Sequence, residues 1–402
     1  MPRTLLYIAY PMRLDLGAAN AIQTYNTVRE LRALIPDMRL AIPRWLREPS
    51  AFAALDAMHL PRPAVNKLSR LVPWAGWSYI ERTLYSFMLV MLLVAWRLLR
   101  RGYRVIYVRD TVCAAWLCLL RGLHGARVIY EVHDLEADHP SRVSRWPRGF
   151  WSRLLPWLDR LALARSHGLV SLTQTFKDWV VGQGLRKTDE IAVIPDAFDP
   201  GLYYPVDMAD ARRDTGLPEK AFIIGYAGLT FAYRGLETLI EAFGMIAQRE
   251  PDALLVLVGG RPAEVDALRS QAKELHIPQD RIVFAGQLPQ ERAVAYVQAA
   301  DVLVIPDTVT GMTASPLKLF EYMSVGKPLV CKDMPALREI VNEEAAIFFG
   351  GGDADALAIA ISTLIAHPAR RERMGQAARA LSDGYTYAAR AARIAEVVHG
   401  AR

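Results

Sequence analysis

The chain has 402 residues, of which 52% are hydrophobic and 22% are charged. This composition excludes a disordered or fibrous protein, and the length predicts two or three domains of roughly 150 residues each. Three cysteines, Cys113, Cys118 and Cys331, exclude a secreted disulfide framework, and their spacing is not that of a zinc site. The formal net charge of +6 does not by itself indicate a partner.

The net positive charge comes from the first half of the chain. Residues 1–200 hold 27 Lys and Arg against 17 Asp and Glu, whereas the remainder holds 21 against 25. All nine Trp also lie in this basic half, and Trp and Arg are interleaved around Trp45 and over 142–165, which includes Trp146 and Trp151. Because this mixture suits an anionic membrane surface, we expect such a surface as a partner. Ordinary core packing of Trp is the alternative.

The most apolar segment is Phe87–Trp96, which is followed by several arginines. Ten apolar residues are fewer than the about 20 that a membrane-spanning helix needs. We expect a helix buried against a sheet, with shallow membrane insertion as the alternative. No N-terminal targeting signal is recognisable, which favours a cytoplasmic protein that is at most peripheral on the inner face of the cell membrane.

Short apolar strands alternate with helix-length segments in both halves, a pattern typical of parallel α/β sheets. A turn-rich stretch over 195–205 separates the halves and predicts a hinge. Two doubly wound domains would bind ligands in a cleft at the carboxyl ends of their strands. The expected strands are Leu5–Ala9, Val105–Val108, Val128–Val132, Leu169–Leu172, Ile191–Ile194, Phe222–Tyr226, Leu254–Val258, Ile282–Phe284, Val302–Ile305 and Leu329–Cys331.

A phosphate-binding helix is predicted just after residue 313. Ser315 suits the N-cap and Pro316 the first helical position, and the N–H groups of that first turn would favour a phosphate. Lys318 and Glu321 are three residues apart and would share one face, where the carboxylate can accept hydrogen bonds from ribose hydroxyls. An ordinary capped helix with a surface Lys and Glu is the alternative.

The string Ser-Pro-x-Lys-x-x-Glu-Tyr-Met, followed by Gly-Lys-Pro-Leu-Val, resembles the nucleotide-sugar site of retaining GT-B glycosyltransferases of family 4 (glycosyl transferases group 1). The resemblance implies two Rossmann-like domains facing across a cleft. These are an acceptor-binding domain over 1–195 and a nucleotide-sugar-binding domain over 196–380, with a helix over 381–402 that packs back on the first. Further segments in the family order are 17–20, 131–134, 194–199, 225–235, 258–260 and 284–286.

The chain departs from the family pattern at four positions. Thr313 stands where the family carries a Glu that contacts the donor sugar, and Leu229 replaces one diphosphate-binding Arg. Asp196 stands where Asn is usual. Arg234 replaces a Lys, but Arg can still bind a diphosphate through its bidentate fork. These departures bear on the identity of the donor sugar.

The resemblance implies a role for each site residue. Arg234, Lys318 and the helix start at Ser315, Pro316 and Leu317 would stabilise the leaving diphosphate by fixed electrostatics. Glu321 would bind the ribose, and His133 would hold the donor sugar near the reacting carbon. The remaining donor contacts would be Gly17, Gly259, Gly286 and Thr313. Alternatively, Gly17 closes a turn and His133 is structural. Neither a metal nor a cofactor other than the nucleotide-sugar substrate is expected.

The expected function is that of a hexosyl-type glycosyltransferase in cell-envelope or polysaccharide biosynthesis. It would move a sugar from a nucleoside-diphosphate-sugar donor to a glycan or lipid-linked, membrane-proximal acceptor, with retention. A sugar-nucleotide 2-epimerase on the same fold and a non-catalytic sugar-nucleotide-binding scaffold are the alternatives. Nucleic acid is not an expected partner, because no recognition motif is present. A dinucleotide fingerprint is also missing after the first strand, which disfavours a dehydrogenase.

Overall fold

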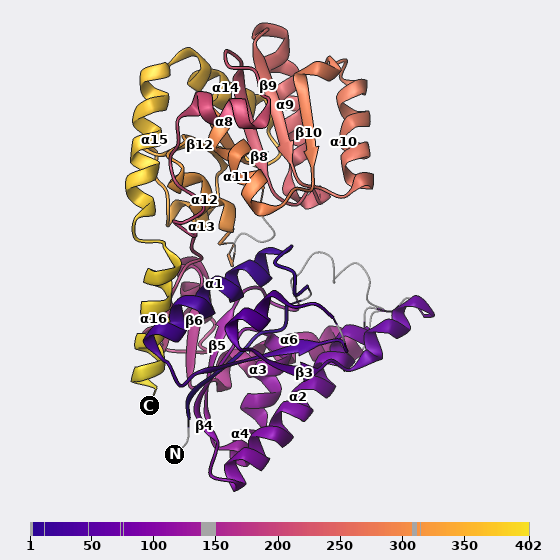
Figure 1. Cartoon of the computed structure of the whole chain (residues 1–402), viewed down its shortest axis with the longest axis vertical. Helices are drawn as coiled ribbons and strands as arrows, with labels where there is room; N and C mark the ends of the chain where they lie inside the picture. The colour runs from indigo at the N-terminus through magenta and orange to yellow at the C-terminus, as the bar shows by residue number, and fades with distance from the viewer. Residues whose placement is uncertain are drawn as a thin grey trace. The chain divides into compact units, whose positions relative to one another are not determined.

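The computed structural model describes residues 3–11, 13–46, 48–72, 74, 76–137, 150–307, 312–313 and 315–401. The chain divides into two compact units (Figure 1). Unit 1 comprises 1–195, 312–314 and 387–402, and unit 2 comprises 196–311 and 315–386.

Unit 1 is built on a seven-stranded parallel sheet with the strand order β3-β2-β1-β4-β5-β6-β7. The five strands expected in this half are present, whereas β2 and β3 were missed. Pro43 and the flanking arginines of β2 hide its strand pattern, and β3 is a short edge strand. The strands are β1 (Arg3–Ile8), β2 (Arg39–Arg44), β3 (Met58–Pro61), β4 (Tyr103–Val108), β5 (Arg127–Val132), β6 (Gly168–Ser171) and β7 (Ile191–Val193).

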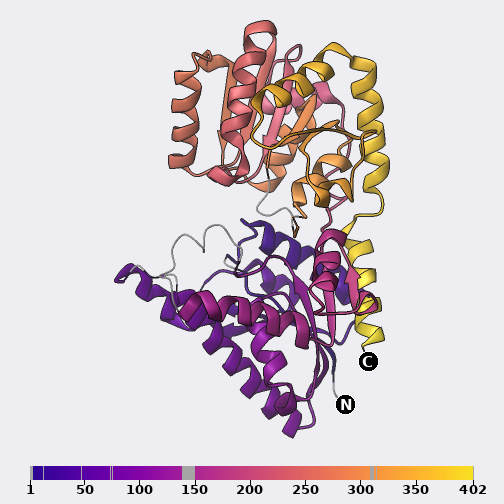
Figure 2. The same cartoon turned by 180° about the vertical axis from the view of Figure 1, so that it is seen from behind.

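Helices cover both faces of this sheet, because side chains alternate between the faces along each strand. On β4, Ile106 and Val108 join a core with α2, α3 and α6, whereas Val105 and Tyr107 join a core with α1 and α16. Figure 2 shows the helices of unit 1 from behind. The helices are α1 (Ala19–Leu34), α2 (Gly76–Leu98), α3 (Thr111–Leu119), α4 (Arg121–His124), α6 (Phe150–Arg165), α7 (Gln174–Gly182) and α16 (Tyr387–Gly400), with 3-10 turns η1 (Ala51–Leu55), η2 (Ala64–Arg70) and η3 (Thr188–Glu190).

Helix α2 is longer than its most apolar stretch suggested. Its 23 residues are long and apolar enough to cross a membrane by length and composition, and 44% of its most apolar 18-residue window is buried. Leu89 and Leu93 face the core of unit 1, whereas Met91 is exposed. The expectation of a helix buried against the sheet is therefore correct for one side of α2 only.

Unit 2 contains a six-stranded parallel sheet with the strand order β10-β9-β8-β11-β12-β13. The expected strands are present, and the short edge strand β13 was missed. The strands are β8 (Phe222–Ala227), β9 (Ala253–Val258), β10 (Ile282–Gly286), β11 (Val302–Ile305), β12 (Leu329–Lys332) and β13 (Ala346–Phe349). The helices are α8 (Met208–Thr215), α9 (Leu236–Arg249), α10 (Pro262–Glu274), α11 (Gln290–Ala299), α12 (Leu317–Ser324), α13 (Pro335–Arg338), α14 (Ala354–Ala366) and α15 (Pro368–Ser382), with 3-10 turns η4 (Ala232–Arg234) and η5 (Gln279–Arg281).

The strand order reverses once in each sheet, between β1 and β4 in unit 1 and between β8 and β11 in unit 2. In open α/β sheets ligands bind outside the carboxyl ends of the strands at such a reversal. In unit 2 this point lies beside the loops that follow β8 and β11, which carry Gly228, Arg234 and Asp307. The predicted class, two doubly wound α/β domains, is confirmed.

Candidate functional site

The start of α12 differs by one residue from the prediction. Ser315 does not cap this helix, because its hydroxyl accepts a hydrogen bond of 3.0 Å from the backbone N–H of Asp196. Pro316 takes the N-cap position instead, without a side-chain cap, and α12 begins at Leu317. The prediction of Ser315 as N-cap and Pro316 as first helical residue is therefore wrong. Among the described residues, no side chain caps the first turn of α12.

Two buried cationic nitrogen atoms lie near α12. The Nζ atom of Lys318 and the Nε atom of Arg234 are buried without a hydrogen-bond partner among the described residues. Lys318 Nζ lies 3.9 Å from the centroid of the Tyr226 ring. Burial, and then the charge of Arg234, lower the pKa of Lys318 well below its usual value. Buried polar groups are normally paired, and a charged hydrogen bond to an anion would satisfy both nitrogen atoms.

Glu321 lies on the same helix as Lys318, and the two charges interact. Burial raises the pKa of Glu321 to about 7, although a hydrogen bond from Tyr203 and the charge of Lys318 act in the opposite direction. Tyr203 lies within the predicted hinge, 195–205. Sequence reasoning missed it, and only the spacing of the interdomain motif could have placed it.

The predicted glycines of unit 2 lie where their strands end. Gly259, with φ of 110°, donates a hydrogen bond of 2.7 Å to the carbonyl of Gly286. A Cβ on Gly259 would lie 2.1 Å from the carbonyl oxygen of Gly228. A Cβ on Gly228 would in turn lie 2.9 Å from Lys318 Nζ. Gly259 therefore allows the close packing that holds the Gly228 turn against Lys318.

In unit 1, His133 lies in a buried polar network at the end of β5. The fully buried Glu131 carboxylate contacts His133 Nε2 at 2.6 Å, Arg109 Nε at 3.0 Å and Arg390 at 2.6 Å, and it accepts a hydrogen bond from the Tyr107 hydroxyl. Burial, and then the charge of Arg109, lower the pKa of His133 to about 4. The imidazole is therefore neutral at pH 7. Sequence reasoning missed the other members of this network.

Gly17 and Thr313 also belong to unit 1. The N–H of Gly17 donates a hydrogen bond of 3.1 Å to the Asp15 carboxylate, which is paired with Arg13. Gly17 thus closes a local turn before α1, as the alternative interpretation of this glycine proposed. Thr313 is buried, and its neighbour Met312 accepts a hydrogen bond from the Thr173 hydroxyl.

The predicted site residues thus form two sets. Unit 1 holds Gly17, His133 and Thr313. The set in unit 2 comprises Arg234, Gly259, Gly286, Ser315, Pro316, Leu317, Lys318 and Glu321.

The predicted membrane contacts are only partly covered by the structure. Trp45 is half-buried, with Lys67 Nζ 4.3 Å and the Arg62 guanidinium 5.1 Å from the ring centroid. Trp146 lies outside the described residues, as does the side chain of Trp151. The interleaved Trp and Arg of 142–165 therefore stay a prediction.

Among the described residues, no group of three or more His, Cys, Asp or Glu could hold a metal ion. The metal-independent reaction that the resemblance implies stays a prediction.

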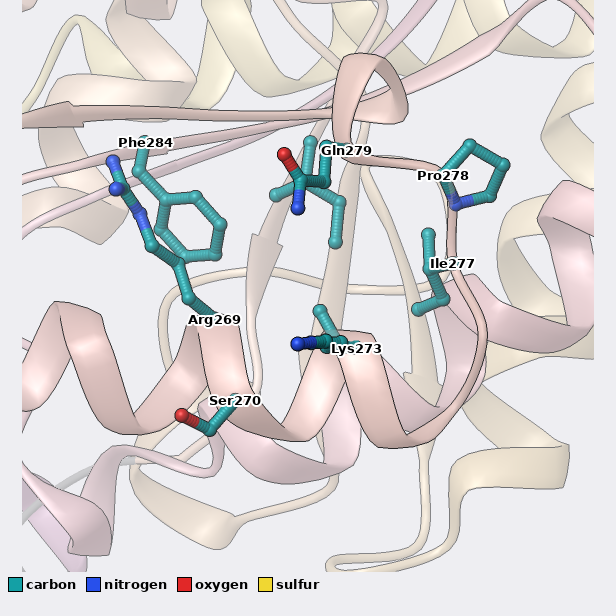
Figure 3. A pocket seen from close by; sticks show the side chains of 9 residues that line it. Arg269, Ser270, Lys273, Ile277, Pro278, Gln279 and Phe284 are labelled. Carbon is teal, nitrogen blue, oxygen red and sulfur yellow. The ribbon is translucent and has the colours of Figure 1, made fainter.

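A cavity of about 390 Å³ lies between α10 and β10 in unit 2 (Figure 3). Arg269 and Lys273 from α10 and Phe284 from β10 contribute to its lining, and the Arg269 guanidinium lies 5.2 Å from the centroid of the Phe284 ring. None of the predicted site residues lines it. The candidate site is therefore defined by the side chains at the carboxyl ends of the strands and not by this cavity.

The two doubly wound sheets define a two-domain α/β protein of the GT-B class. Sucrose-phosphate synthase from Thermosynechococcus elongatus has a TM-score of 0.75 at 20% identity, with 99% of both chains covered. HepE from Anabaena, solved in complex with UDP and glucose, has a TM-score of 0.72 at 17% identity, also with 99% of both chains covered. At these identities the likeness shows the fold.

Sequence comparison identifies the family. Residues 207–381 match the model for glycosyl transferases group 1, and residues 21–202 match the model for glycosyltransferase family 4. D-inositol 3-phosphate glycosyltransferase from Corynebacterium efficiens is 30% identical over 297 residues, which are 69% of this chain and 67% of that protein. Other curated relatives are matched over about half of their own length. The chain belongs to the group 1, family 4 glycosyltransferases.

Proposed function

We propose that the protein transfers a sugar from a nucleoside-diphosphate-sugar donor to a hydroxyl group of an acceptor, without a metal ion and with retention of the anomeric configuration. One observation carries the proposal. Among the described residues, Lys318 Nζ and Arg234 Nε are buried without hydrogen-bond partners, and Lys318 interacts with both Arg234 and Glu321. A diphosphate would pair with the two cations, while the carboxylate would accept hydrogen bonds from the ribose.

The chemistry of this site concerns the leaving group. As the bond between the anomeric carbon and the phosphate oxygen breaks, negative charge develops on the diphosphate. Lys318, Arg234 and the start of α12 would stabilise that charge from fixed positions. The acceptor oxygen forms its bond to the anomeric carbon on the same face, and its proton passes to the leaving phosphate oxygen. The residues of unit 2 would therefore act without a dedicated protein base.

In unit 1, His133 would contact the donor sugar. Since its pKa is lowered to about 4, the ring is uncharged at neutral pH and serves as a hydrogen-bonding group. Arg109 and Glu131 fix its orientation through contacts to Nε2 at 2.9 Å and 2.6 Å. A positioning role of this kind agrees with the rigid network around Glu131.

For the acceptor, we propose a phosphate-bearing or lipid-linked polyol or glycan at the inner face of the cell membrane, within cell-envelope biosynthesis. The name of the Corynebacterium relative gives a phosphorylated inositol as its acceptor. The excess of 27 basic over 17 acidic residues in 1–200 suits a phosphate group. Gly17, at the start of α1, would lie close to the donor.

The first test is a thermal-shift screen of UDP, GDP, ADP and TDP and their sugars, because a ligand that binds the folded state raises the unfolding temperature. Donors that stabilise the protein are then incubated with membrane lipid extracts, and labelled product is followed. Glu321→Ala and Arg234→Ala should abolish stabilisation, whereas Arg249→Ala, an exposed arginine of the same unit, should not. Unchanged stabilisation in both site variants would contradict the proposal.

Two alternatives give other outcomes in the same experiment. Epimerisation of the donor without an acceptor would indicate a sugar-nucleotide 2-epimerase. Binding without hydrolysis or transfer under any acceptor would indicate a scaffold, for which Thr313 and Leu229 are the relevant departures from the family pattern.

A further inference from the structure

Helix α2 carries an apolar stripe on its outer side. Its exposed positions are spaced by three or four residues, so that they share one face of the helix. No charged residue occurs over 83–96, a helical length of about 21 Å. Met91 is 68% exposed and Leu98 is 79% exposed. The exposed positions over this stretch and its last turn, apart from Arg97, are Leu84, Phe87, Met91, Ala95 and Leu98.

The stripe continues onto neighbouring helices. The ring of Phe87 lies 5.0 Å from that of Trp116 on α3, and Trp116 lies 6.4 Å from Trp157 on α6. Trp157 is 44% exposed. Three helices of unit 1 therefore share an aromatic row that reaches the surface at both ends, a feature more typical of an interaction surface than of a solvated one.

Exposed arginines lie at the C-terminal end of this stripe. Residues 82–130 contain eight Arg and one acidic residue, Asp110, but Arg82 and Arg109 are buried in ion pairs with Glu136 and Glu131 and do not belong to this surface. Beyond the C-terminal end of α2, Arg100 and Arg101 are exposed. Arg97 donates hydrogen bonds to the carbonyls of Gly122 and Leu123, which places the exposed Leu123 beside the same end of the helix. The apolar stripe and the cations thus lie next to each other.

We propose that this surface, named the α2 face and defined by Leu84, Phe87, Met91, Leu98 and Trp157, lies on the anionic leaflet of a membrane. The apolar side chains enter the interface, and the arginines contact lipid phosphates. The inference deepens the membrane part of the proposed function and rests on it. It locates the contact on α2, for which shallow membrane insertion was the alternative interpretation of the sequence. Of the interleaved Trp and Arg over 142–165 it includes only Trp157, and it does not include Trp45.

Two other occupants fit less well. A membrane-spanning α2 would have to leave the core of unit 1, where Tyr85, Leu89 and Leu93 are buried. A second copy docked through the same face would offer these arginines no carboxylate, because the α2 face itself carries none. An anionic lipid surface satisfies the apolar stripe and the arginines at once.

The test is flotation of the full-length protein with vesicles of phosphatidylcholine, with and without phosphatidylglycerol. We expect binding to anionic vesicles that weakens at about 0.5 M NaCl, since salt screens the arginine contacts. Met91→Glu should reduce vesicle partitioning by about tenfold or more. Ile359→Glu, which changes a 67% exposed residue of α14 in unit 2, is the matched control and should leave binding unchanged. Thermal unfolding of each variant verifies that it is folded.

Specific outcomes would overturn the inference. One is a wild-type protein that does not float with anionic vesicles, and another is a folded Met91→Glu variant that floats like the wild type. A dimer in sedimentation that Met91→Glu dissociates would assign the face to a second copy. Nucleotide binding is measured in parallel without vesicles. If it persists while flotation fails, the α2 face is refuted and the donor site is not, whereas flotation without nucleotide binding refutes the donor site alone.

Discussion

The hydroxyl of Tyr203 is hydrogen-bonded to the carboxyl group of Glu321. Tyr203 lies in the predicted hinge, 195–205, and Glu321 lies in α12. The bond therefore joins two distant parts of the sequence within unit 2. Burial raises the pKa of Glu321 to about 7, whereas this bond and the charge of Lys318 lower it. The residue proposed to bind ribose therefore titrates near neutral pH, which leads to the first two predictions.

Nucleotide affinity should depend on Glu321 between pH 6 and pH 8. The pKa is raised to about 7, so the carboxyl group becomes protonated as the pH falls through that value and accepts ribose hydrogen bonds less well. We expect several-fold weaker binding at pH 6 than at pH 8, measured by calorimetry. Glu321→Gln is the control, and the ratio of wild-type to variant affinity at each pH isolates this carboxyl from Lys318. A ratio that does not vary with pH would contradict the assignment.

Tyr203→Phe should move this pH dependence upward. The hydrogen bond from Tyr203 lowers the pKa of Glu321. Without that bond, burial should raise the pKa further. The midpoint of the affinity ratio should then lie above that of the wild type, with little change in affinity at high pH. A lower midpoint would show that Tyr203 favours the protonated form of Glu321 instead.

Removing either cation should weaken binding of nucleoside diphosphates. A hydrogen bond to a charged group contributes about 1.5–3 kcal/mol, so Arg234→Ala and Lys318→Met should each lower affinity roughly 10- to 100-fold. The loss should be larger for a diphosphate than for the corresponding nucleoside, because the cations face the phosphates. Arg249→Ala, at the exposed end of α9, is the matched control in titration calorimetry. Equal losses for diphosphate and nucleoside would argue against this role.

Lys318→Met should also stabilise the ligand-free protein. The ammonium group is buried without a hydrogen-bond partner among the described residues, and burial lowers its pKa well below the usual value. Methionine fills a similar volume without a polar group, so we expect the free energy of unfolding to rise by about 1–3 kcal/mol. Denaturant unfolding without nucleotide measures it. A variant that is less stable would mean that the contact between Lys318 and the Tyr226 ring outweighs the cost of burial.

Arg390→Met should destabilise unit 1. The change leaves the fully buried Glu131 carboxylate without one of its cations, and breaking a buried pair in this way costs about 3–5 kcal/mol. The double variant Arg390→Met with Glu131→Gln should recover part of the loss, because it removes the uncompensated charge. Urea unfolding of the four proteins in this cycle provides the measurement. Additive losses would show that the two residues act independently.

The fold could be predicted from the sequence largely because parallel strands buried on both faces are continuous apolar runs, as in β4, β9 and β11. Of the strands that were missed, β2 contains Pro43 and begins and ends with an arginine, β3 ends in a proline, and β13 is only four residues long. The pattern of short apolar runs found the other strands, including the edge strands β7 and β10.

The candidate site was less predictable, because its decisive contacts join residues that are far apart in sequence. The string around Lys318 and Glu321 is local, and motif reasoning found it. The partners of these groups are not local. Tyr203 reaches Glu321 across unit 2, and Arg390 reaches Glu131 from the last helix. The same effect explains the error at Ser315, whose hydroxyl binds the backbone of the distant Asp196 and not the helix that follows it.

The position of α16 has a consequence for how the protein is made. This helix belongs to unit 1 and lies beside α1 (Figure 1). It joins the same core through residues such as Ile394 and Val398, and Arg390 lies within hydrogen-bonding distance of the Ile194 and Pro195 carbonyls. On a translating ribosome, the sheet of unit 1 emerges first, but its last helix emerges after the whole of unit 2. Unit 2 can thus complete its core before α16 emerges, whereas Glu131 in unit 1 has its contacts to Arg109 and His133 but lacks Arg390 until α16 follows. A protein of residues 1–195 alone would lack α16 and, with it, the contact between Arg390 and Glu131.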